Sequence, residues 1–261
     1  MIKCPNCQKK LIKFERQYVC ENKHSFDIAK QGYTNLLIHT QKSTGDNKEM
    51  VDARQQFFAN DYYKTLKNFL ISLIKESNIK CMVDAGCGEG YYTNAIYDAL
   101  NIDVYGFDMS KIALQKASRS HKAVNYFVSS VFDMPLYDSS VDLVLSVFAP
   151  ISYLENRRIL KDGGLFIKVS PLERHLWQLK EVLYQEPYEN EMKYDEAEGF
   201  ELIKEYKVKD TITINSSEDI MALFMMTPYY YRSPKDGVER LKSLDSLKTD
   251  IEFKIEVYKK S

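Results

Sequence analysis

Two groups of residues in this chain have the side-chain types and the spacing to do chemistry. The first is Cys4, Cys7, Cys20 and His24, in the pattern C-x2-C-x12-C-x3-H. Thiolate sulfur and imidazole nitrogen at such spacings are ligands for a tetrahedral zinc ion. The second group lies in residues 84–90, where an acidic residue is followed by three alternate glycines. Glycines let the backbone approach a bound molecule closely, so this segment is typical of a cofactor loop.

The metal-binding pattern predicts a structural site. Pro5 and Asn6 favour a turn between the first two cysteines, and residues 14–19 can supply a hairpin that brings the other two ligands to them. Four protein ligands leave no open position on the metal, so we expect zinc to stabilise the fold. A segment this short lacks a core of its own, and its folding should therefore depend on the metal. The alternative is a set of thiols without metal.

The cofactor loop follows an apolar segment and opens a helical one, which is the order of a strand, a glycine turn and a helix. Its spacing is G-x-G-x-G, unlike the G-x-G-x-x-G of dinucleotide-binding folds. Asp108 ends the next apolar segment, where a carboxylate can accept hydrogen bonds from both hydroxyls of a ribose. The pattern predicts a cofactor that contains a nucleoside. A generic nucleotide-binding fold, including an NAD-linked one, is the alternative.

Short apolar segments alternate with helical patterns from residue 80 onward, which predicts βαβ units and a parallel, doubly wound sheet. Two helices over 49–76 precede the sheet, and the polar residues 39–48 are typical of a linker or mobile loop. The expected strands are 80–84, 103–108, 125–128, 141–148 and 165–169, with antiparallel edge strands around 207–209 and 251–257; the expected helices are 91–100, 111–118, 152–160 and 171–184, with a turn at 162–164.

The charge is unevenly spread along the chain. Residues 1–48 hold nine Lys or Arg and four acidic residues, a net +5, so the remainder carries −6 of the overall −1. A basic module favours an anionic partner, although a lysine-rich solvated surface would have the same composition. Five cysteines, an odd number, favour a reducing compartment. No segment resembles a signal peptide or reaches the length of about 18 apolar residues that spans a membrane, so we expect a cytoplasmic protein without membrane contact.

The glycine loop, Asp108 and residues 160–164 together resemble the class I S-adenosylmethionine-dependent methyltransferases. The resemblance implies that the loop holds the methionine part of the cofactor and that Asp108 holds the ribose. It also implies a polar residue near the adenine after the third strand, for which Ser130 and Asp133 are the candidates. The expected fold is α/β, a Rossmann-like class I methyltransferase sheet with a small N-terminal zinc-binding domain.

A closer resemblance is to the bacterial 23S rRNA guanine-N1 methyltransferases, which carry an N-terminal zinc-binding domain. It rests on the cysteine pattern and on residues 26–37, 86–93, 148–150, 174–176 and 226–228. The family implies methylation of a guanine in one hairpin loop of 23S rRNA near the peptide exit tunnel, and it is compatible with a homodimer whose two zinc modules shape one RNA cleft. Two subgroups methylate neighbouring guanines, one of them associated with macrolide-type antibiotic resistance or susceptibility, and the sequence does not choose between them.

The closer family also implies cofactor contacts at Tyr63, Gly88, Glu89 and His175, and a structural Zn2+. Residues 151–155 depart from the family pattern, so a helix at this position can differ from that of the family. The full set of expected cofactor-binding residues is Tyr63, Asp84, Gly86, Gly88, Glu89, Gly90, Asp108, Ser130 and His175; the expected metal ligands are Cys4, Cys7, Cys20 and His24.

No residue is assigned as catalytic. His175, Asp84 and Glu89 are titratable candidates for accepting the guanine proton, and backbone carbonyls of 148–150 are the other acceptors at the expected position of the base. Residues 229–232, three tyrosines and an arginine, favour either base stacking or ordinary packing. Trp177 is expected in the core.

The chain divides, on this interpretation, into a zinc-binding RNA-recognition module over 1–37, a linker and helices over 38–78, and an S-adenosylmethionine-dependent methyltransferase domain over 79–261. The basic module favours 23S rRNA as the partner. Two other hypotheses remain: a methyltransferase of tRNA, protein or a small molecule, and a nucleic-acid-binding module with an inactive methyltransferase fold.

Overall fold

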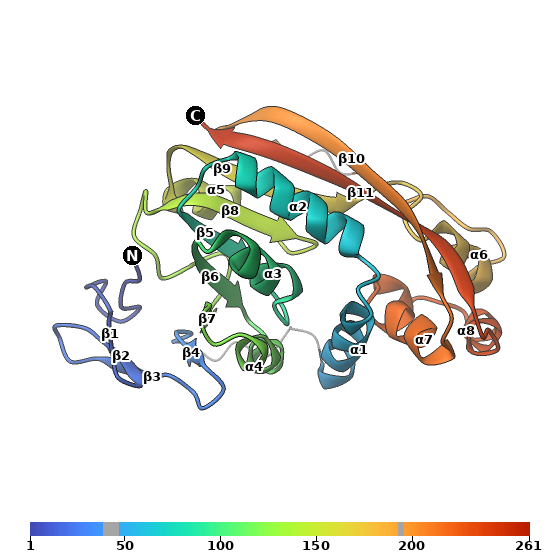
Figure 1. The fold of residues 1–261 in the computed structure, drawn as a ribbon, viewed down its shortest axis with the longest axis horizontal. Helices are drawn as coiled ribbons and strands as arrows, with labels where there is room; N and C mark the ends of the chain where they lie inside the picture. The colour runs from blue at the N-terminus through green and yellow to red at the C-terminus, as the bar shows by residue number, and fades with distance from the viewer. Residues whose placement is uncertain (39–46, 193–195) are drawn as a thin grey trace.

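The computed structural model describes residues 1–38, 47–192 and 196–261, and most of the expected linker at 39–48 lies outside them. Within this part of the chain, no helix combines the length and the apolar character that crossing a membrane requires. Two sheets and eight α-helices make up the described fold, with the larger sheet at its centre (Figure 1).

The larger sheet has eight strands in the order β10-β11-β9-β8-β5-β6-β7-β4. The six strands from β9 to β4 run parallel; at one edge β11 pairs antiparallel with β9, and β10 pairs antiparallel with β11. The predicted doubly wound sheet with antiparallel edge strands is therefore confirmed. The strands are β4 Tyr33–Asn35, β5 Cys81–Ala85, β6 Asp103–Asp108, β7 Asn125–Val128, β8 Val141–Val147, β9 Leu160–Pro171, β10 Phe200–Ile214 and β11 Leu247–Lys260.

The helices up to α5 follow the predicted pattern for most of their length, whereas α7, α8 and the turn η1 were not predicted. Ser110 accepts a hydrogen bond from the backbone N–H of Ala113 at 3.2 Å, which caps α4. The helices are α1 Lys48–Ala59, α2 Lys64–Glu76, α3 Tyr91–Leu100, α4 Lys111–Ser120, α5 Tyr153–Ile159, α6 Trp177–Leu183, α7 Ser217–Met225 and α8 Lys235–Lys242, with a 3-10 turn η1 at Pro228–Tyr231.

Three expectations about the second half of the chain are wrong. The predicted turn at 162–164 is an irregularity inside β9, where the pairing with β8 shifts from Val141↔Leu160 to Leu143↔Leu165. The helix expected from 171 begins only at Trp177, because Leu176 has a left-handed backbone (φ 59°) that no helix can include. Trp177 is half-buried rather than in the core, with the Arg174 guanidinium 4.1 Å from its ring centroid.

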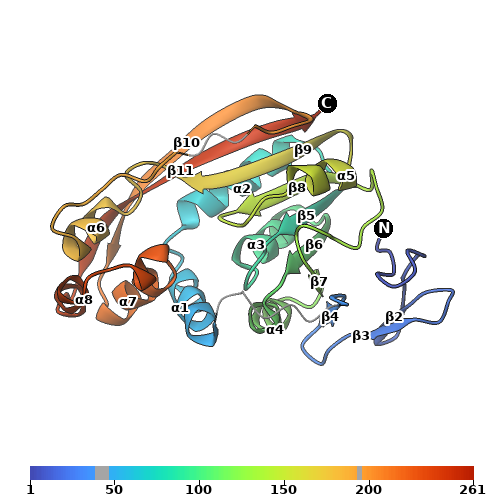
Figure 2. The ribbon, with the colours of Figure 1, turned by 180° about the vertical axis from the view of Figure 1, so that it is seen from behind.

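The two faces of the large sheet are covered differently. Helices α2, α3 and α4 cover one face, which lies toward the viewer in Figure 1. The other face, seen in Figure 2, packs against α5 and against the N-terminal module. That module holds the three-stranded sheet β1-β2-β3 (Ile12–Phe14, Gln17–Val19 and Ser25–Asp27).

The N-terminal module is joined to the large sheet by backbone and side-chain contacts. Strand β4 pairs in parallel with β7, with Thr34 opposite Phe127. The buried Tyr18 ring packs edge-on against Phe127 at 5.5 Å, and Leu11 and Leu36 belong to the same apolar cluster. The metal-binding segment is therefore fixed against the sheet and shares its core.

Candidate cofactor site and metal centre

The glycine loop joins β5 to α3 at the carboxyl edge of the sheet. Gly86, Gly88 and Gly90 have φ values of 86°, 54° and 82°, which only glycine adopts at low cost. A Cβ on Gly86 would lie 2.3 Å from the Cβ of Ala149, so this turn also needs glycine for space. The loop therefore has the shape that the sequence predicted, and it touches the segment that follows β8.

Asp108 ends the neighbouring strand β6, as predicted. Its carboxylate accepts hydrogen bonds from the backbone N–H of Gly88 at 2.9 Å and of Ser110 at 2.7 Å. These donors orient the carboxylate beside the glycine loop, and a carboxylate has about four lone-pair sites in all. The position and the chemistry fit the two hydroxyls of a ribose.

Asp84 is buried at the end of β5, directly before the glycine loop. It accepts a hydrogen bond from the Thr93 hydroxyl at 2.6 Å. Burial raises the pKa of Asp84 to about 7, against the lowering effect of the Thr93 hydrogen bond. A nearby cation would lower this pKa, so a positively charged ligand would favour the ionised form of the carboxyl group.

Glu89 is buried in the loop and is held by α1. The Arg54 Nε lies 2.7 Å from the Glu89 Oε2, and the Arg54 guanidinium lies beside Gly88. Burial raises the pKa of Glu89, and the Arg54 guanidinium opposes that effect. Arg54 and Thr93 were not predicted as site residues: Arg54 comes from the distant helix α1, and Thr93 lies in the first turn of α3, directly after the glycine loop.

Tyr63 and His175 are 112 residues apart in the chain and meet inside the protein. The Tyr63 hydroxyl lies 3.2 Å from His175 Nε2, and His175 Nδ1 accepts a hydrogen bond from the backbone N–H of Glu252 at 3.1 Å. Since Nδ1 is the acceptor, the neutral ring carries its proton on Nε2 and donates it to the tyrosine oxygen. Burial lowers the pKa of His175 to about 3, so this histidine is neutral near pH 7 and has no basic nitrogen left for a substrate proton.

Ser130 and Asp133 follow β7, in the predicted region. The backbone N–H of Ser129 donates to the Asp108 carbonyl at 3.2 Å, which holds this loop beside the end of β6. The Ser130 hydroxyl accepts from the backbone N–H of Phe132 at 3.2 Å, whereas Asp133 is exposed. Ser130 thus directly follows the residue that contacts the end of β6, whereas Asp133 lies three residues further along the chain.

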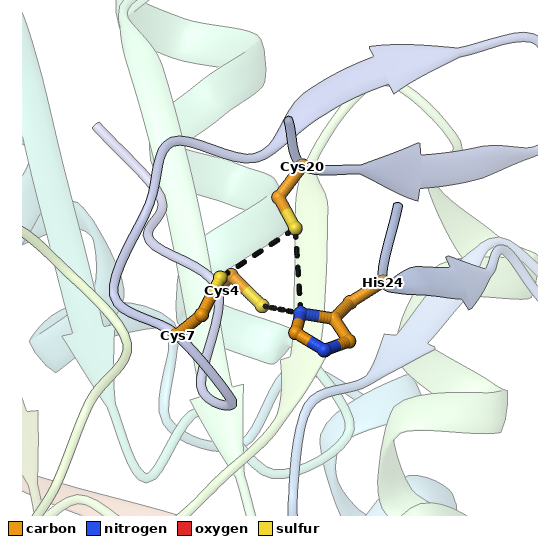
Figure 3. A group of neighbouring side chains, drawn as sticks. All are labelled: Cys4, Cys7, Cys20 and His24. Carbon is orange, nitrogen blue, oxygen red and sulfur yellow. Dashed lines mark hydrogen bonds between the residues drawn. The ribbon is translucent and has the colours of Figure 1, made fainter. Parts of the chain in front are cut away.

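The four predicted metal ligands converge. Their ligand atoms all lie within 4.8 Å of one another, and Figure 3 shows the three thiols and the imidazole pointing to one centre. The Cys4 Sγ and the Cys20 Sγ each lie 3.5 Å from His24 Nδ1, and Cys7 Sγ lies 3.6 Å from Cys20 Sγ. Three sulfurs and one nitrogen at such separations fit tetrahedral zinc, whose bonds to sulfur are about 2.3 Å long.

A parallel sheet with antiparallel edge strands, a G-x-G-x-G turn after one strand and an acid after the next is typical of the class I methyltransferases, which use S-adenosylmethionine. Residues 76–221 match the family model described as "Methyltransferase domain". A solved Galdieria sulphuraria protein, provisionally named a sarcosine dimethylglycine methyltransferase, has the same fold, with a TM-score of 0.52 at 12% identity over 80% of this chain and 98% of that one.

Two further similarities assign the chain to a narrower family within this class. Residues 2–44 match the model described as "RlmA, N-terminal", a zinc ribbon. The chain is 30% identical to a Streptomyces fradiae 23S rRNA (guanine(748)-N(1))-methyltransferase, over 94% of this chain and 91% of that protein. It is 29% identical to a Bacillus subtilis (strain 168) protein provisionally named a 23S rRNA (guanine-N1)-methyltransferase, over 98% and 95%. The chain belongs to the family of 23S rRNA (guanine-N1)-methyltransferases with a zinc ribbon.

Removal of zinc should unfold the N-terminal module and weaken the whole protein. The module buries Leu11, Tyr18 and Leu36 against the large sheet, and a loss of about 4 kcal/mol would lower the Tm by about 10 °C. Differential scanning calorimetry before and after chelation measures this change, and elemental analysis should find one zinc per chain. Cys20→Ala should lose that zinc. Cys81→Ala, outside the metal cluster, is the control that should keep it, and equal zinc contents would refute the assignment.

The pKa of His175 predicts a pH dependence of stability. Between pH 6.5 and 3 the unfolded chain binds a proton on this histidine that the folded chain does not bind, so the contribution of His175 to the free energy of unfolding falls as the pH falls. Between pH 7 and 5 this contribution should decrease by about 2 kcal/mol, while the raised pKa of Asp84 contributes in the opposite direction in both proteins. In His175→Asn the histidine contribution is absent, so the stability of the variant relative to the unchanged protein, measured by urea denaturation at each pH, should rise by about 2 kcal/mol between pH 7 and 5. Parallel profiles for the two proteins would contradict the prediction, since zinc loss affects both equally.

Proposed function

We propose that this protein transfers a methyl group from S-adenosylmethionine to N1 of a guanine in a hairpin loop of 23S rRNA. The observation that carries the proposal is the 30% identity to a 23S rRNA guanine-N1 methyltransferase over 94% of the chain, which includes both the zinc ribbon and the glycine loop. Such a reaction takes place where ribosomal RNA is made and assembled, so we place the protein in the cytoplasm.

The cofactor supplies an electrophilic methyl group on a sulfonium, and the protein positions it. In our proposal Asp108 accepts from the ribose hydroxyls, and the glycine loop with Asp84 and Glu89 holds the amino-acid part. Ser130 lies on the adenine side, and Tyr63 with His175 closes the site from the opposite wall. The proposed cofactor-binding residues are Tyr63, Asp84, Gly86, Gly88, Glu89, Gly90, Asp108, Ser130 and His175.

The guanine N1 atom carries a proton near neutral pH and lies on the pairing edge of the base. The base must therefore be unpaired and turned toward the cofactor before reaction. The three candidates for a basic side chain are held by other groups: His175 is neutral with its proton on Nε2, Glu89 is paired with Arg54, and the buried Asp84 accepts from the Thr93 hydroxyl. This supports catalysis by orientation, with backbone carbonyls of 148–150 accepting from the guanine N–H groups.

The three segments have separate roles in the proposal. Residues 1–37 form the zinc-binding RNA-recognition module, 38–78 the linker and helices, and 79–261 the methyltransferase domain. Because β4 pairs with β7, an RNA held by the first segment keeps a constant position relative to the cofactor loop. A homodimer with two zinc modules around one RNA is compatible with this arrangement.

The proposal is tested by methylation of protein-free 23S rRNA with labelled S-adenosylmethionine. N1-methylguanine blocks base pairing, so reverse transcription of the product should stop at one guanine of the hairpin and identify it. Binding of S-adenosylmethionine is measured separately by calorimetry. Cofactor binding without methylation of the rRNA would refute the proposed substrate and favour tRNA, a protein or a small molecule as the methyl acceptor. The absence of cofactor binding would refute the proposal that the protein is an active methyltransferase.

The zinc module should supply salt-dependent RNA affinity. Lys10, Lys13 and Arg16 are exposed on it, and Lys9 is paired with Glu21 at 2.9 Å. Reversing the charge of the three exposed residues to Glu should weaken RNA binding and reduce the salt dependence by about 0.7–0.9 per lost phosphate contact, with unchanged cofactor affinity. Filter binding at several salt concentrations measures this.

The matched control reverses three exposed lysines far from the module: Lys75 on α2 and Lys204 and Lys207 on β10. In Figure 1 strand β10 and the module lie at opposite sides of the molecule. If both triple variants bind RNA equally well, the docking role of the zinc module is wrong.

A further inference from the structure

Phe148, at the end of β8, has a backbone conformation that is rare for its type. Its φ is +54°, in the left-handed region that large side chains avoid. Nine non-glycine residues of the described chain have positive φ, and only Phe148 and Leu176 among them are large and apolar. Leu176 follows His175 in the chain and is buried, whereas 44% of the Phe148 surface is exposed. Such strain persists where the surrounding structure enforces it, often at functional sites.

The strained backbone is fixed from two directions. The backbone N–H of Phe148 donates to the Val169 carbonyl of β9 at 3.2 Å. On the other side, Ala149 packs directly against Gly86, where a Cβ would come within 2.3 Å. The direction of the Phe148 side chain is therefore coupled to the position of the glycine loop.

The Phe148 ring is the exposed edge of a buried aromatic cluster. Its centroid lies 5.7 Å from the Phe253 ring and 6.5 Å from the His175 ring. Phe253 in turn packs against His175 at 4.9 Å and against Tyr63 at 5.1 Å. Tyr63, His175 and Phe253 are all buried, so they support Phe148 from behind and leave part of its ring to solvent.

We infer that the Phe148 ring stacks on the target guanine. This inference rests on the proposed function and adds the residue that receives the base. A guanine that leaves the RNA stack loses its stacking contacts with the neighbouring bases, and an aromatic side chain can replace one of these contacts. Phe148 lies after a parallel strand at the carboxyl edge of the sheet, where ligands bind in such folds, and next to the loop proposed for the cofactor. The ring therefore lies where the base must come to meet the methyl group.

The test separates the ring from the backbone. Phe148→Gly removes the ring and adopts positive φ without strain, Phe148→Leu keeps an apolar side chain without a π face, and Phe148→Tyr keeps the ring. We expect kcat/KM for 23S rRNA to fall by about 10- to 100-fold in the first two and to stay within about 3-fold of the unchanged protein in the third. The affinity for S-adenosylmethionine, measured by calorimetry without RNA, should be unchanged in all three.

Leu154→Ala is the matched control, since Leu154 is 81% exposed on α5, a few residues further along the chain. Normal kcat/KM in Phe148→Leu would overturn the inference and leave the proposed function intact. A loss of cofactor affinity as large as the loss of kcat/KM would also overturn it, because the ring would then serve the cofactor. Failure of the unchanged protein to methylate 23S rRNA, by contrast, would overturn the proposed function and the inference with it.

Discussion

The structure depends on how the second face of its parallel sheet is covered. A parallel sheet has two apolar faces, and both must be removed from water. Helices α2, α3 and α4 cover one face, but part of the other is covered by a module of three short strands that has no large core. That module keeps its shape through Cys4, Cys7, Cys20 and His24, so the metal cluster stabilises a surface well beyond its own ligands.

The same packing relates the two chemical centres of the molecule. Tyr18 of the metal-binding module contacts Phe127 on β7, and β7 lies beside β6, which ends in Asp108. Strand β7 therefore lies between the zinc module and strand β6, which ends in the acid proposed to hold the ribose. A large substrate gripped by the module would meet the cofactor in a defined position without a moving domain, and precise positioning is the main contribution that a protein makes to methyl transfer.

The sequence predicted the parts of the fold that local patterns determine. The strand at 103–108 and the helix at 91–100 have their predicted bounds, because their apolar periods and their flanking glycines or caps are local signals. Strand β4 was not predicted, since it has three residues and its partner β7 lies about 90 residues further along the chain. The late start of α6 also escaped prediction, because the left-handed Leu176 is held by a hydrogen bond to the Asp250 carbonyl of the distant strand β11.

The electrostatics of the candidate site fit a cation better than a neutral ligand. Three carboxyl groups lie in or beside one glycine loop, those of Asp84, Glu89 and Asp108. The Arg54 guanidinium pairs with Glu89. Burial holds the pKa of Asp84 near 7, so a positive charge nearby would favour its ionised form and be stabilised in return. In the proposed arrangement Asp84 and Glu89 face the amino-acid part of S-adenosylmethionine, and its α-ammonium group carries such a charge.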